Sequence, residues 1–187
     1  ILFWINIFIN CSDLYFKKLK ENQLNFFFPL IDTGGVEKNF FIISKYLVKK
    51  LTNFNHYIVT FKKTPHIKKN IDKEIKIIKS ELVSFTISRR FKFILCMIQL
   101  FINCLKFQNS IIFSFQGNFY ALFIAFILKR KIIVRSNVTP EAWGTNIFKR
   151  KIFNFLLSKS NLIIVNNLDF KKKFKKYFNL RTTKIYN

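Results

Sequence analysis

Short apolar runs alternate with helical patterns along most of this chain, and that alternation restricts the fold more than any other feature of the sequence. The apolar runs are rich in Ile, Val and Phe, as expected of buried strands, and they cover residues 25–30, 56–61, 75–79, 110–115, 132–135 and 162–165. Apolar residues recur at helical spacing in residues 36–51, 84–107, 118–128, 147–157 and 168–178. Because strands that are apolar throughout must be covered on both faces, the pattern predicts a doubly wound, Rossmann-like α/β domain with a parallel sheet.

The length of 187 residues suits one domain with a substantial core, since 50% of the residues are hydrophobic. We assign residues 25–187 to this domain and treat residues 1–24 as an N-terminal extension of uncertain structure. The net charge of +24 is compatible with nucleic acid, anionic lipid or phosphorylated ligands. The abundance of Lys, Asn, Ile and Phe is what an AT-rich genome would produce, so the charge alone is weak evidence of function.

Several chemistries lack the residues that they need. Cys11, Cys96 and Cys104 form no C-x-x-C pair, which favours reduced thiols in a cytoplasmic protein. His56 and His66 have no cysteine or acidic residue at metal-ligand spacing, so we expect no metal site. The sequence contains no G-x-S-x-G, G-x-G-x-x-G or P-loop motif, which disfavours acyl transfer and ordinary dinucleotide or ATP binding. No uninterrupted apolar stretch reaches the roughly 18 residues that a membrane span needs.

Polar residues follow three of the predicted strands at the point where each strand ends. D-T-G-G-V-E occupies residues 32–37, Q-G-N occupies 116–118, and S-N-V-T-P-E-A-W occupies 136–143. Ligands of doubly wound sheets bind at the carboxyl ends of the strands, so we expect these loops to face one cleft. Gly34 and Gly35 would expose backbone N–H groups at a helix N-terminus, where the helix dipole favours phosphate, and Glu37 in the first turn suits the same dipole.

Taken together, these segments resemble the N-terminal domain of the family 4 retaining glycosyltransferases, which have the two-domain GT-B architecture. G-G-V-E at residues 34–37 is similar to the family's G-G-x-E turn. S-F-Q-G-N at 114–118, I-V-R-S-N at 133–137 and P-E-A-W at 140–143 resemble its fourth and fifth strand ends. S-N-L-I-I-V-N-N at 160–167 is similar to a further strand of that domain, and K-I-Y-N at 184–187 to the segment that leads into the second domain. The resemblance covers residues 25–187.

The resemblance implies the acceptor-binding half of a transferase that uses a UDP- or GDP-sugar as co-substrate, without a metal or another cofactor. In the family the C-terminal domain carries the nucleotide-sugar pocket, and the chain stops where that domain should begin. We therefore expect little or no activity from this chain alone, and no catalytic residue is assigned. Gly34, Gly35 and Glu37 would face the donor phosphates. The residues expected to contact the sugar or the acceptor are Gln116, Asn118, Arg135, Asn137 and Glu141.

One departure from the family pattern concerns the donor. Many members have His in or near the loop after the fourth strand, where it contacts the transferred sugar, and the matching residue here is Gln116. A neutral amide can bind a sugar hydroxyl but cannot titrate. The sequence therefore does not identify the sugar that is transferred.

The expected partner is a sugar or a lipid-linked glycan, in lipopolysaccharide or other polysaccharide synthesis, at the inner face of the cytoplasmic membrane. Residues 84–107 mix Arg89, Arg90 and Lys92 with apolar residues, which suits a helix lying on an anionic membrane, and equally a core helix with a basic outer face. A non-catalytic, membrane-associated partner subunit is one alternative function. A basic nucleic-acid-binding module is another; it would bind with a steep salt dependence, and we disfavour it because most Phe residues lie in the buried pattern.

Overall fold

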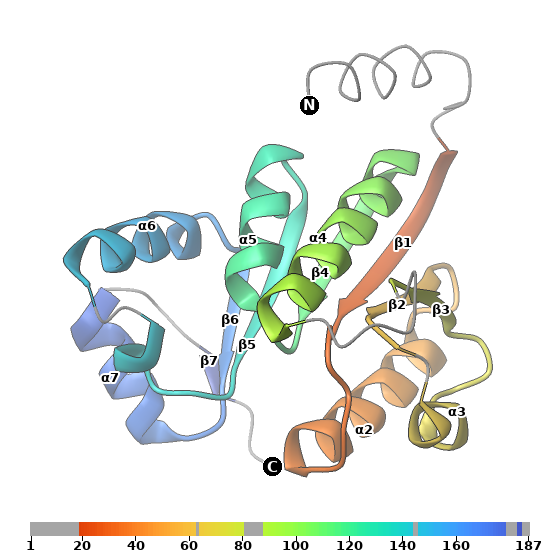
Figure 1. The fold of residues 1–187 in the computed structure, drawn as a ribbon, viewed down its shortest axis with the longest axis horizontal. Helices are drawn as coiled ribbons and strands as arrows, with labels where there is room; N and C mark the ends of the chain where they lie inside the picture. The colour runs from red at the N-terminus through yellow and green to blue at the C-terminus, as the bar shows by residue number, and fades with distance from the viewer. Residues whose placement is uncertain (1–18, 63, 81–87, 144–145, 179–182, 185–187) are drawn as a thin grey trace.

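The computed structural model describes residues 19–62, 64–80, 88–143, 146–178 and 183–184, and its described part is built on one parallel sheet (Figure 1). The strand order is β3-β2-β1-β4-β5-β6-β7, and every pair of neighbouring strands is parallel. The doubly wound, Rossmann-like α/β fold that the sequence predicted is therefore confirmed. The strands are β1 (Leu19–Phe27), β2 (Asn55–Thr60), β3 (Lys76–Lys79), β4 (Phe107–Ser114), β5 (Lys131–Ser136), β6 (Leu162–Val165) and β7 (Thr183–Lys184).

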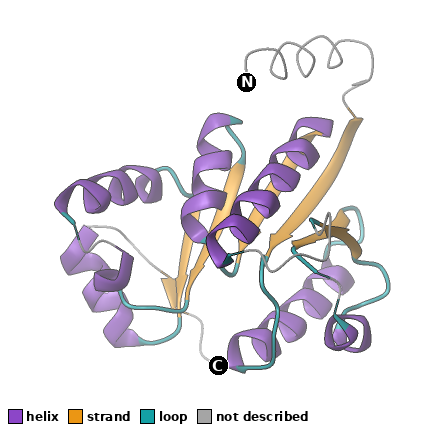
Figure 2. Ribbon diagram, viewed as in Figure 1, coloured by secondary structure: helices purple, strands orange, loops and turns teal. Residues whose placement is uncertain are grey.

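Helices cover the sheet on both faces, and the core is divided between two apolar clusters (Figure 2). One cluster joins the sheet to α2 and α3 and contains Phe26, Phe28 and Phe40. The other joins the opposite face to α4, α5, α6 and α7, through residues such as Leu100 and Phe174. The helices are α2 (Gly35–Lys50), α3 (Pro65–Asn70), α4 (Arg89–Lys106), α5 (Asn118–Ile127), the 3-10 helix η1 (Pro140–Trp143), α6 (Ile147–Ser158) and α7 (Leu168–Phe178).

Phenylalanine rings fill the first cluster. Phe26, Phe28 and Phe115 lie at the centre, and Phe40 of α2 meets each of them edge-on or nearly so at centroid distances of 5.6, 5.3 and 5.0 Å. Burying one such ring contributes about 1.5–3 kcal/mol, and edge-to-face contact adds to that. Twelve phenylalanines of the described chain are buried, so these rings make up much of its core.

The structure corrects several element boundaries. β1 begins at Leu19 rather than at residue 25, so residues 19–24, which we had assigned to the extension, pair with β4 across an irregularity between Leu19 and Asn22. The polar residues of this segment gave no strand pattern, because their pairing partner lies far along the chain. The division of the chain into an extension, a domain and a missing second domain otherwise stays a prediction.

Three short elements were missed, and one predicted helix is shorter than expected. α3 has only six residues, capped by the Thr64 hydroxyl with Pro65 at its first position; η1 and the two-residue β7 are shorter still. Helix α4 begins at Arg89 rather than at residue 84, and residues 81–87 lie outside the described part. None of the described helices is long and apolar enough to cross a membrane.

Candidate functional site

The loops at the carboxyl ends of β1, β4, β5 and β6 meet along one edge of the sheet, as the parallel strand order requires (Figure 1). Hydrogen bonds join these loops to one another. The backbone N–H of Leu30, after β1, donates to Gln116 Oε1, after β4, at 3.0 Å. Asn137, after β5, donates from Nδ2 to the carbonyl oxygen of Phe115 at 2.8 Å. The edge is therefore a connected surface and not a set of independent loops.

The loop after β1 leads into α2 through Gly34 and Gly35. α2 begins at Gly35, and no described side chain caps its N-terminus. The first N–H groups of a helix have no partner inside it, so these donors face outward at the positive end of the helix dipole. A Cβ atom at Gly35 would meet no atom within 4 Å beyond its chain neighbours and its own helix backbone, whereas one at Gly34 would lie 2.7 Å from Glu37 Oε2. Glu37 Oε1 lies 3.5 Å from the backbone nitrogen of Asp32, at the limit of a hydrogen bond.

The loop after β4 is held by Gly117 and Asn118. Gly117 has a left-handed backbone with φ of 67°, and α5 begins at the next residue. Asn118 accepts from the Ser114 hydroxyl at 2.6 Å and donates to the carbonyl oxygen of Arg135 at 3.0 Å. Both ends of its amide are thus engaged in joining the ends of β4 and β5, so Asn118 has a structural role in the described chain.

Arg135 points into the protein and not into solvent. Its side chain is 3% exposed, it donates to Asn166 Oδ1 at 3.3 Å, and its guanidinium lies 5.7 Å from the centroid of the Phe115 ring. Burial lowers the pKa of Arg135 from its usual value, because desolvation penalises the charged form. Sequence analysis expected this cation to meet a phosphate or sugar directly. In the described structure Arg135 ties the ends of β5 and β6 together, and its contact with a phosphate or sugar stays a prediction.

Gln116 and Asn137 line a hollow of about 290 Å³ between the loops after β4 and β5. We call it the β4–β5 hollow; it is lined by Phe115, Gln116, Gly117, Asn118, Phe119, Asn137, Val138 and Phe153. Two aromatic rings form part of its wall, with the centroids of Phe119 and Phe153 5.0 Å apart. Amide groups beside aromatic faces are a combination that suits a hydroxylated ligand.

Each of the two amides leaves one polar atom free within the described part of the chain. Asn137 uses Nδ2 on a carbonyl oxygen, which can only accept, so the other end must be Oδ1; that atom is buried and has no partner among the described residues. Gln116 uses Oε1 on a backbone N–H, which leaves its Nε2 as a donor. A buried acceptor without a partner costs about 1–3 kcal/mol. The β4–β5 hollow therefore offers one acceptor and one donor.

Glu141 lies apart from the residues that line this hollow. It is exposed on η1, and hydrogen bonds from its own backbone N–H and from the Thr139 hydroxyl lower the pKa of its carboxyl group. The group stays charged and can only accept. The side chain of Trp143 lies outside the described residues.

Sequence reasoning missed three residues that shape this edge. Asn166 directly follows β6, and the same rule that pointed to Asn137 would have found it. Ser114 is the last residue of β4, and a serine at that position is not unusual in a strand, so the sequence contains no sign of its hydrogen bond to Asn118. Phe153 comes from α6 and reaches the hollow only through the packing of α6 beside α5, which no local pattern shows.

Comparison with known proteins finds no family model that matches the sequence and no curated protein with a significant match. Solved structures match the fold. HepE from Anabaena, in complex with UDP-glucose, is 15% identical with a TM-score of 0.61, over 88% of this chain and 43% of its own. Sucrose-phosphate synthase from Thermosynechococcus elongatus is 8% identical with a TM-score of 0.64, over 88% of this chain and 47% of its own.

This chain spans less than half the length of either protein. At such identities the matches establish the fold alone: the chain has the α/β fold of one half of a GT-B glycosyltransferase. The resemblance found in the sequence is thereby confirmed at the level of the fold. Further structures of HepE hold UDP, or UDP and glucose, and match over 89% of this chain with TM-scores of 0.59 and 0.62.

Proposed function

We propose that the chain is the acceptor-binding, N-terminal half of a nucleotide-sugar-dependent retaining glycosyltransferase that acts in cell-surface glycan or glycolipid synthesis. The observation that carries the proposal is the β4–β5 hollow, where Asn137 Oδ1 and Gln116 Nε2 have no partner among the described residues at the carboxyl edge of a GT-B half fold. A sugar hydroxyl both donates and accepts hydrogen bonds, so sugar hydroxyls can satisfy an acceptor and a donor alike. An apolar ligand would leave both atoms without partners.

The loop between β1 and α2 supplies the second part of the proposed site. When a sugar leaves a nucleoside diphosphate, negative charge builds up on the leaving oxygen, and fixed N–H donors stabilise it without having to reorient. The uncapped N-terminus of α2 at Gly34 and Gly35 offers such donors. The open space beside Gly35 leaves room for the diphosphate of a UDP- or GDP-sugar, which the second domain of a GT-B architecture would hold from the other side.

Other residues of the edge act by positioning these groups. Asn118 joins the ends of β4 and β5 through its hydrogen bond to the carbonyl oxygen of Arg135. Arg135 in turn joins the ends of β5 and β6 through its hydrogen bond to Asn166. We assign Glu141 to the rim, where a charged acceptor on η1 can meet an acceptor hydroxyl. Such supports matter because misplacing a contact by 1 Å can cost about 100-fold in rate.

A substitution of equal size tests the hydroxyl site. Gln116→Glu keeps the Oε1 atom that accepts from Leu30 N–H and replaces the free donor with an acceptor. Binding to the best ligands on a glycan array should fall about tenfold, because the hydrogen bond from Gln116 Nε2 to a sugar oxygen is replaced by two acceptor atoms that face each other. Gln108→Glu is the matched control, because it makes the same charge change at the exposed, opposite end of β4. Equal loss in both variants would refute the assignment.

Calorimetry with UDP and GDP tests the assignment to the acceptor half. The proposal places the nucleotide pocket on the other domain, so this chain alone should bind either nucleotide weakly. Tight binding of UDP or GDP to the chain would mean that it is the donor half, and the proposal would fail.

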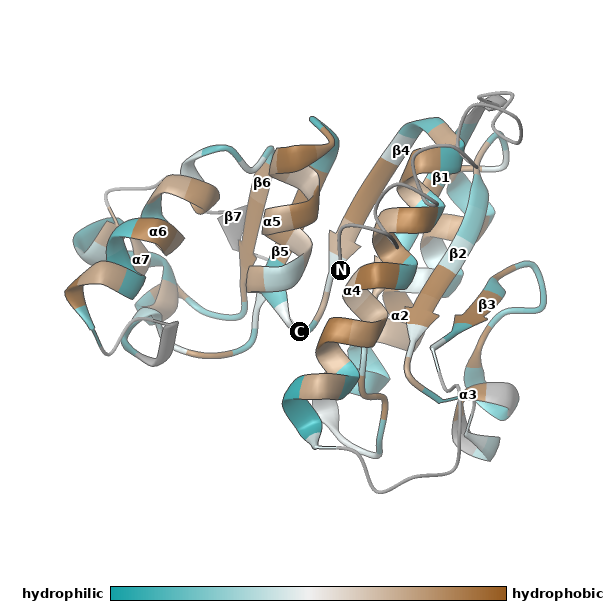
Figure 3. Ribbon diagram, turned by 45° about the horizontal axis from the view of Figure 1, so that its top comes forward, coloured by the Kyte–Doolittle hydropathy of each residue, from teal (hydrophilic) through white to brown (hydrophobic). Residues whose placement is uncertain are grey.

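A second candidate function, a membrane-associated partner subunit, is favoured by the helix face formed by α4, α5 and α6. Each helix exposes apolar side chains, and in Figure 3 α4 and α5 are coloured largely hydrophobic. From residue 82 to residue 168 the only acidic residue is Glu141, whereas α4 and α6 together carry seven Lys and Arg residues. Exposed apolar groups among many basic and few acidic residues suit an anionic bilayer surface. The exposed apolar residues are Phe91, Ile94 and Ile98 of α4, Phe119, Phe123, Phe126 and Ile127 of α5, and Ile147, Phe148 and Phe155 of α6.

Flotation with vesicles tests this surface. The chain should float with vesicles that contain an anionic phospholipid, and Phe91→Ser with Phe123→Ser should abolish flotation. Ile42→Ser on α2 is the control, since Ile42 is 67% exposed and α2 packs against the opposite face of the sheet. Flotation that depends on Ile42 as strongly as on the two phenylalanines would rule out this face.

A further inference from the structure

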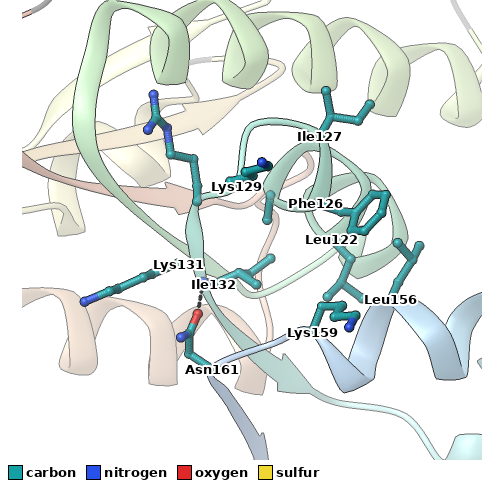
Figure 4. Close-up of a pocket in the computed structure, with 11 residues that line it drawn as sticks. Leu122, Phe126, Ile127, Lys129, Lys131, Ile132, Leu156, Lys159 and Asn161 are labelled. Atoms are coloured by element: carbon teal, nitrogen blue, oxygen red, sulfur yellow. Dashed lines mark hydrogen bonds between the residues drawn. The ribbon is translucent and has the colours of Figure 1, made fainter.

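The amino edge of the sheet, opposite the candidate site, carries a hollow with a volume of about 640 Å³ (Figure 4). It lies between the end of α5, the start of β5 and the end of α6, and we call it the α5–α6 hollow. Its lining combines apolar side chains with four cations: Leu122, Ala125, Phe126, Ile127, Lys129, Arg130, Lys131, Ile132, Leu156, Lys159 and Asn161.

The three consecutive cations at residues 129–131, which we call the basic turn, also line a second hollow, of about 300 Å³, on their other side. This second hollow is polar, with amides from Asn22, Gln108 and Asn109 and the Ser110 hydroxyl among its lining residues. Neither hollow is lined by an acidic residue. The basic turn therefore separates an apolar hollow from a polar one, and its charge is not neutralised by any lining residue of either.

The backbone of the basic turn is fixed in a conformation that lysine seldom adopts. Lys129 has φ of 52°, the left-handed region that favours glycine at a helix end. Hydrogen bonds from Lys129 N to the carbonyl oxygen of Phe126 and from Arg130 N to that of Ala125 hold it there, at 3.3 and 2.9 Å. In Figure 4 the Lys159 side chain lies beside Leu156, whereas the Lys131 side chain extends away from Leu156.

Arg130 is held from within the protein and still has donor capacity. Its Nη2 donates to the carbonyl oxygen of Cys104 at 3.0 Å, and its Nε is buried without a hydrogen-bond partner in the described chain. A guanidinium presents its donors in a planar fork that matches phosphate oxygens. The exposed Lys129 and Lys131 flank it as point charges.

We propose that the basic turn binds the phosphate of an anionic phospholipid and that the α5–α6 hollow receives one of the lipid's acyl chains. The chemistry of the lining favours this ligand. The cations can bind a phosphate, and Leu122, Ile132 and Leu156 can bind an apolar chain that is joined to that phosphate. A second copy of this chain is a poor occupant, because each copy carries a net charge of +24. The proposal does not depend on glycosyl transfer, since the candidate cleft lies on the opposite edge of the sheet.

A soluble short-chain lipid tests the site without interference from the overall charge of the protein. The probe is dihexanoyl phosphatidic acid below its micelle concentration, measured by calorimetry against the 187-residue chain, with dihexanoyl phosphatidylcholine and inorganic phosphate as comparisons. We expect the phosphatidic acid to bind at least about tenfold more tightly than either, because it alone satisfies both parts of the site. Equal binding of inorganic phosphate, equal binding of phosphatidylcholine, or no binding of phosphatidic acid would each overturn the proposal.

Two variants separate the polar part from the apolar part. Lys129→Asn with Lys131→Gln removes two charges, and Asn tolerates the left-handed backbone of Lys129, so the fold should persist. Phosphatidic acid binding should weaken about tenfold or more in this variant and stay unchanged in Lys171→Gln with Lys172→Gln, which removes two exposed cations from α7. Phe126→Ser, at the exposed rim, should weaken lipid binding but leave phosphate binding unchanged. Lipid binding that survives both site variants would refute the site, and folding of each variant is checked by circular dichroism.

Discussion

Gly117 is the residue at which one added methyl group should be most costly. Its φ of 67° is strained for any residue with a Cβ atom, and a Cβ built there lies 2.6 Å from Phe93 Cδ1, 2.7 Å from Phe93 Cε1 and 3.2 Å from Phe27 Cε1. Both phenylalanines are buried, so neither ring can move freely. Gly117→Ala is therefore expected to destabilise the fold through both its backbone and its packing.

The expected loss follows from those two contributions. Placing Ala in the left-handed region costs about 1–2 kcal/mol, and forcing an extra carbon into a packed core costs about 1–3 kcal/mol. A gain of about 0.4–1 kcal/mol is set against them, because Ala restricts the unfolded chain more than Gly does. The free energy of unfolding should therefore fall by about 1–5 kcal/mol, a large part of the roughly 5–15 kcal/mol typical of a whole domain.

Urea unfolding followed by circular dichroism measures this loss, and Gly35→Ala is the matched control. A Cβ at Gly35 meets no described atom within 4 Å, and its φ is not positive, so the same substitution in the first turn of α2 should be neutral or stabilising by up to about 0.5–1 kcal/mol. In a Phe93→Leu background the cost of Gly117→Ala should shrink towards the backbone contribution of about 1–2 kcal/mol. A Gly117→Ala protein within about 0.5 kcal/mol of the wild type would show that the described geometry of this turn is wrong.

Three further outcomes are expected. Asn103→Leu should lower the free energy of unfolding by about 1–3 kcal/mol, since it leaves buried Asn25 Oδ1 without its 2.7 Å hydrogen bond; Asn53→Leu, at an exposed turn, should not. Burial raises the pKa of the Cys104 thiol from 9.0 to about 11. The free energy of unfolding of the wild-type chain should therefore fall between pH 9 and pH 11 by more than that of Cys104→Ala, and an equal fall in both proteins would contradict this. Burial lowers the pKa of His56 below 6.5, its ordinary value, so acid titration should remove stability below that pH, and His56→Leu should flatten the profile.

Local apolar patterns fixed most of the secondary structure in advance. β6 and α7 begin and end at the residues predicted, and four of the other predicted strands begin and end within three residues of their predicted bounds, because periodicity follows from which face of an element is buried. The polar loops after β1, β4 and β5 were also correctly expected to lie along one edge, since parallel strands end on the same side of a sheet. These features depend on short stretches of sequence and on the chirality common to all such folds.

Only the tertiary structure decided what the polar residues of that edge do. Nothing near Arg135 in the sequence shows that its guanidinium is buried over Phe115, or that Gln116 is fixed by Leu30, 86 residues earlier. Those contacts arise because β4 lies between β1 and β5, so residues far apart in the chain become neighbours across the sheet. The same order leaves Asn137 Oδ1 without a partner among the described residues and places the basic turn at the opposite edge. The sequence alone determines which residues can bind a sugar or a phosphate, whereas strand order and packing determine which of their atoms remain free to do so.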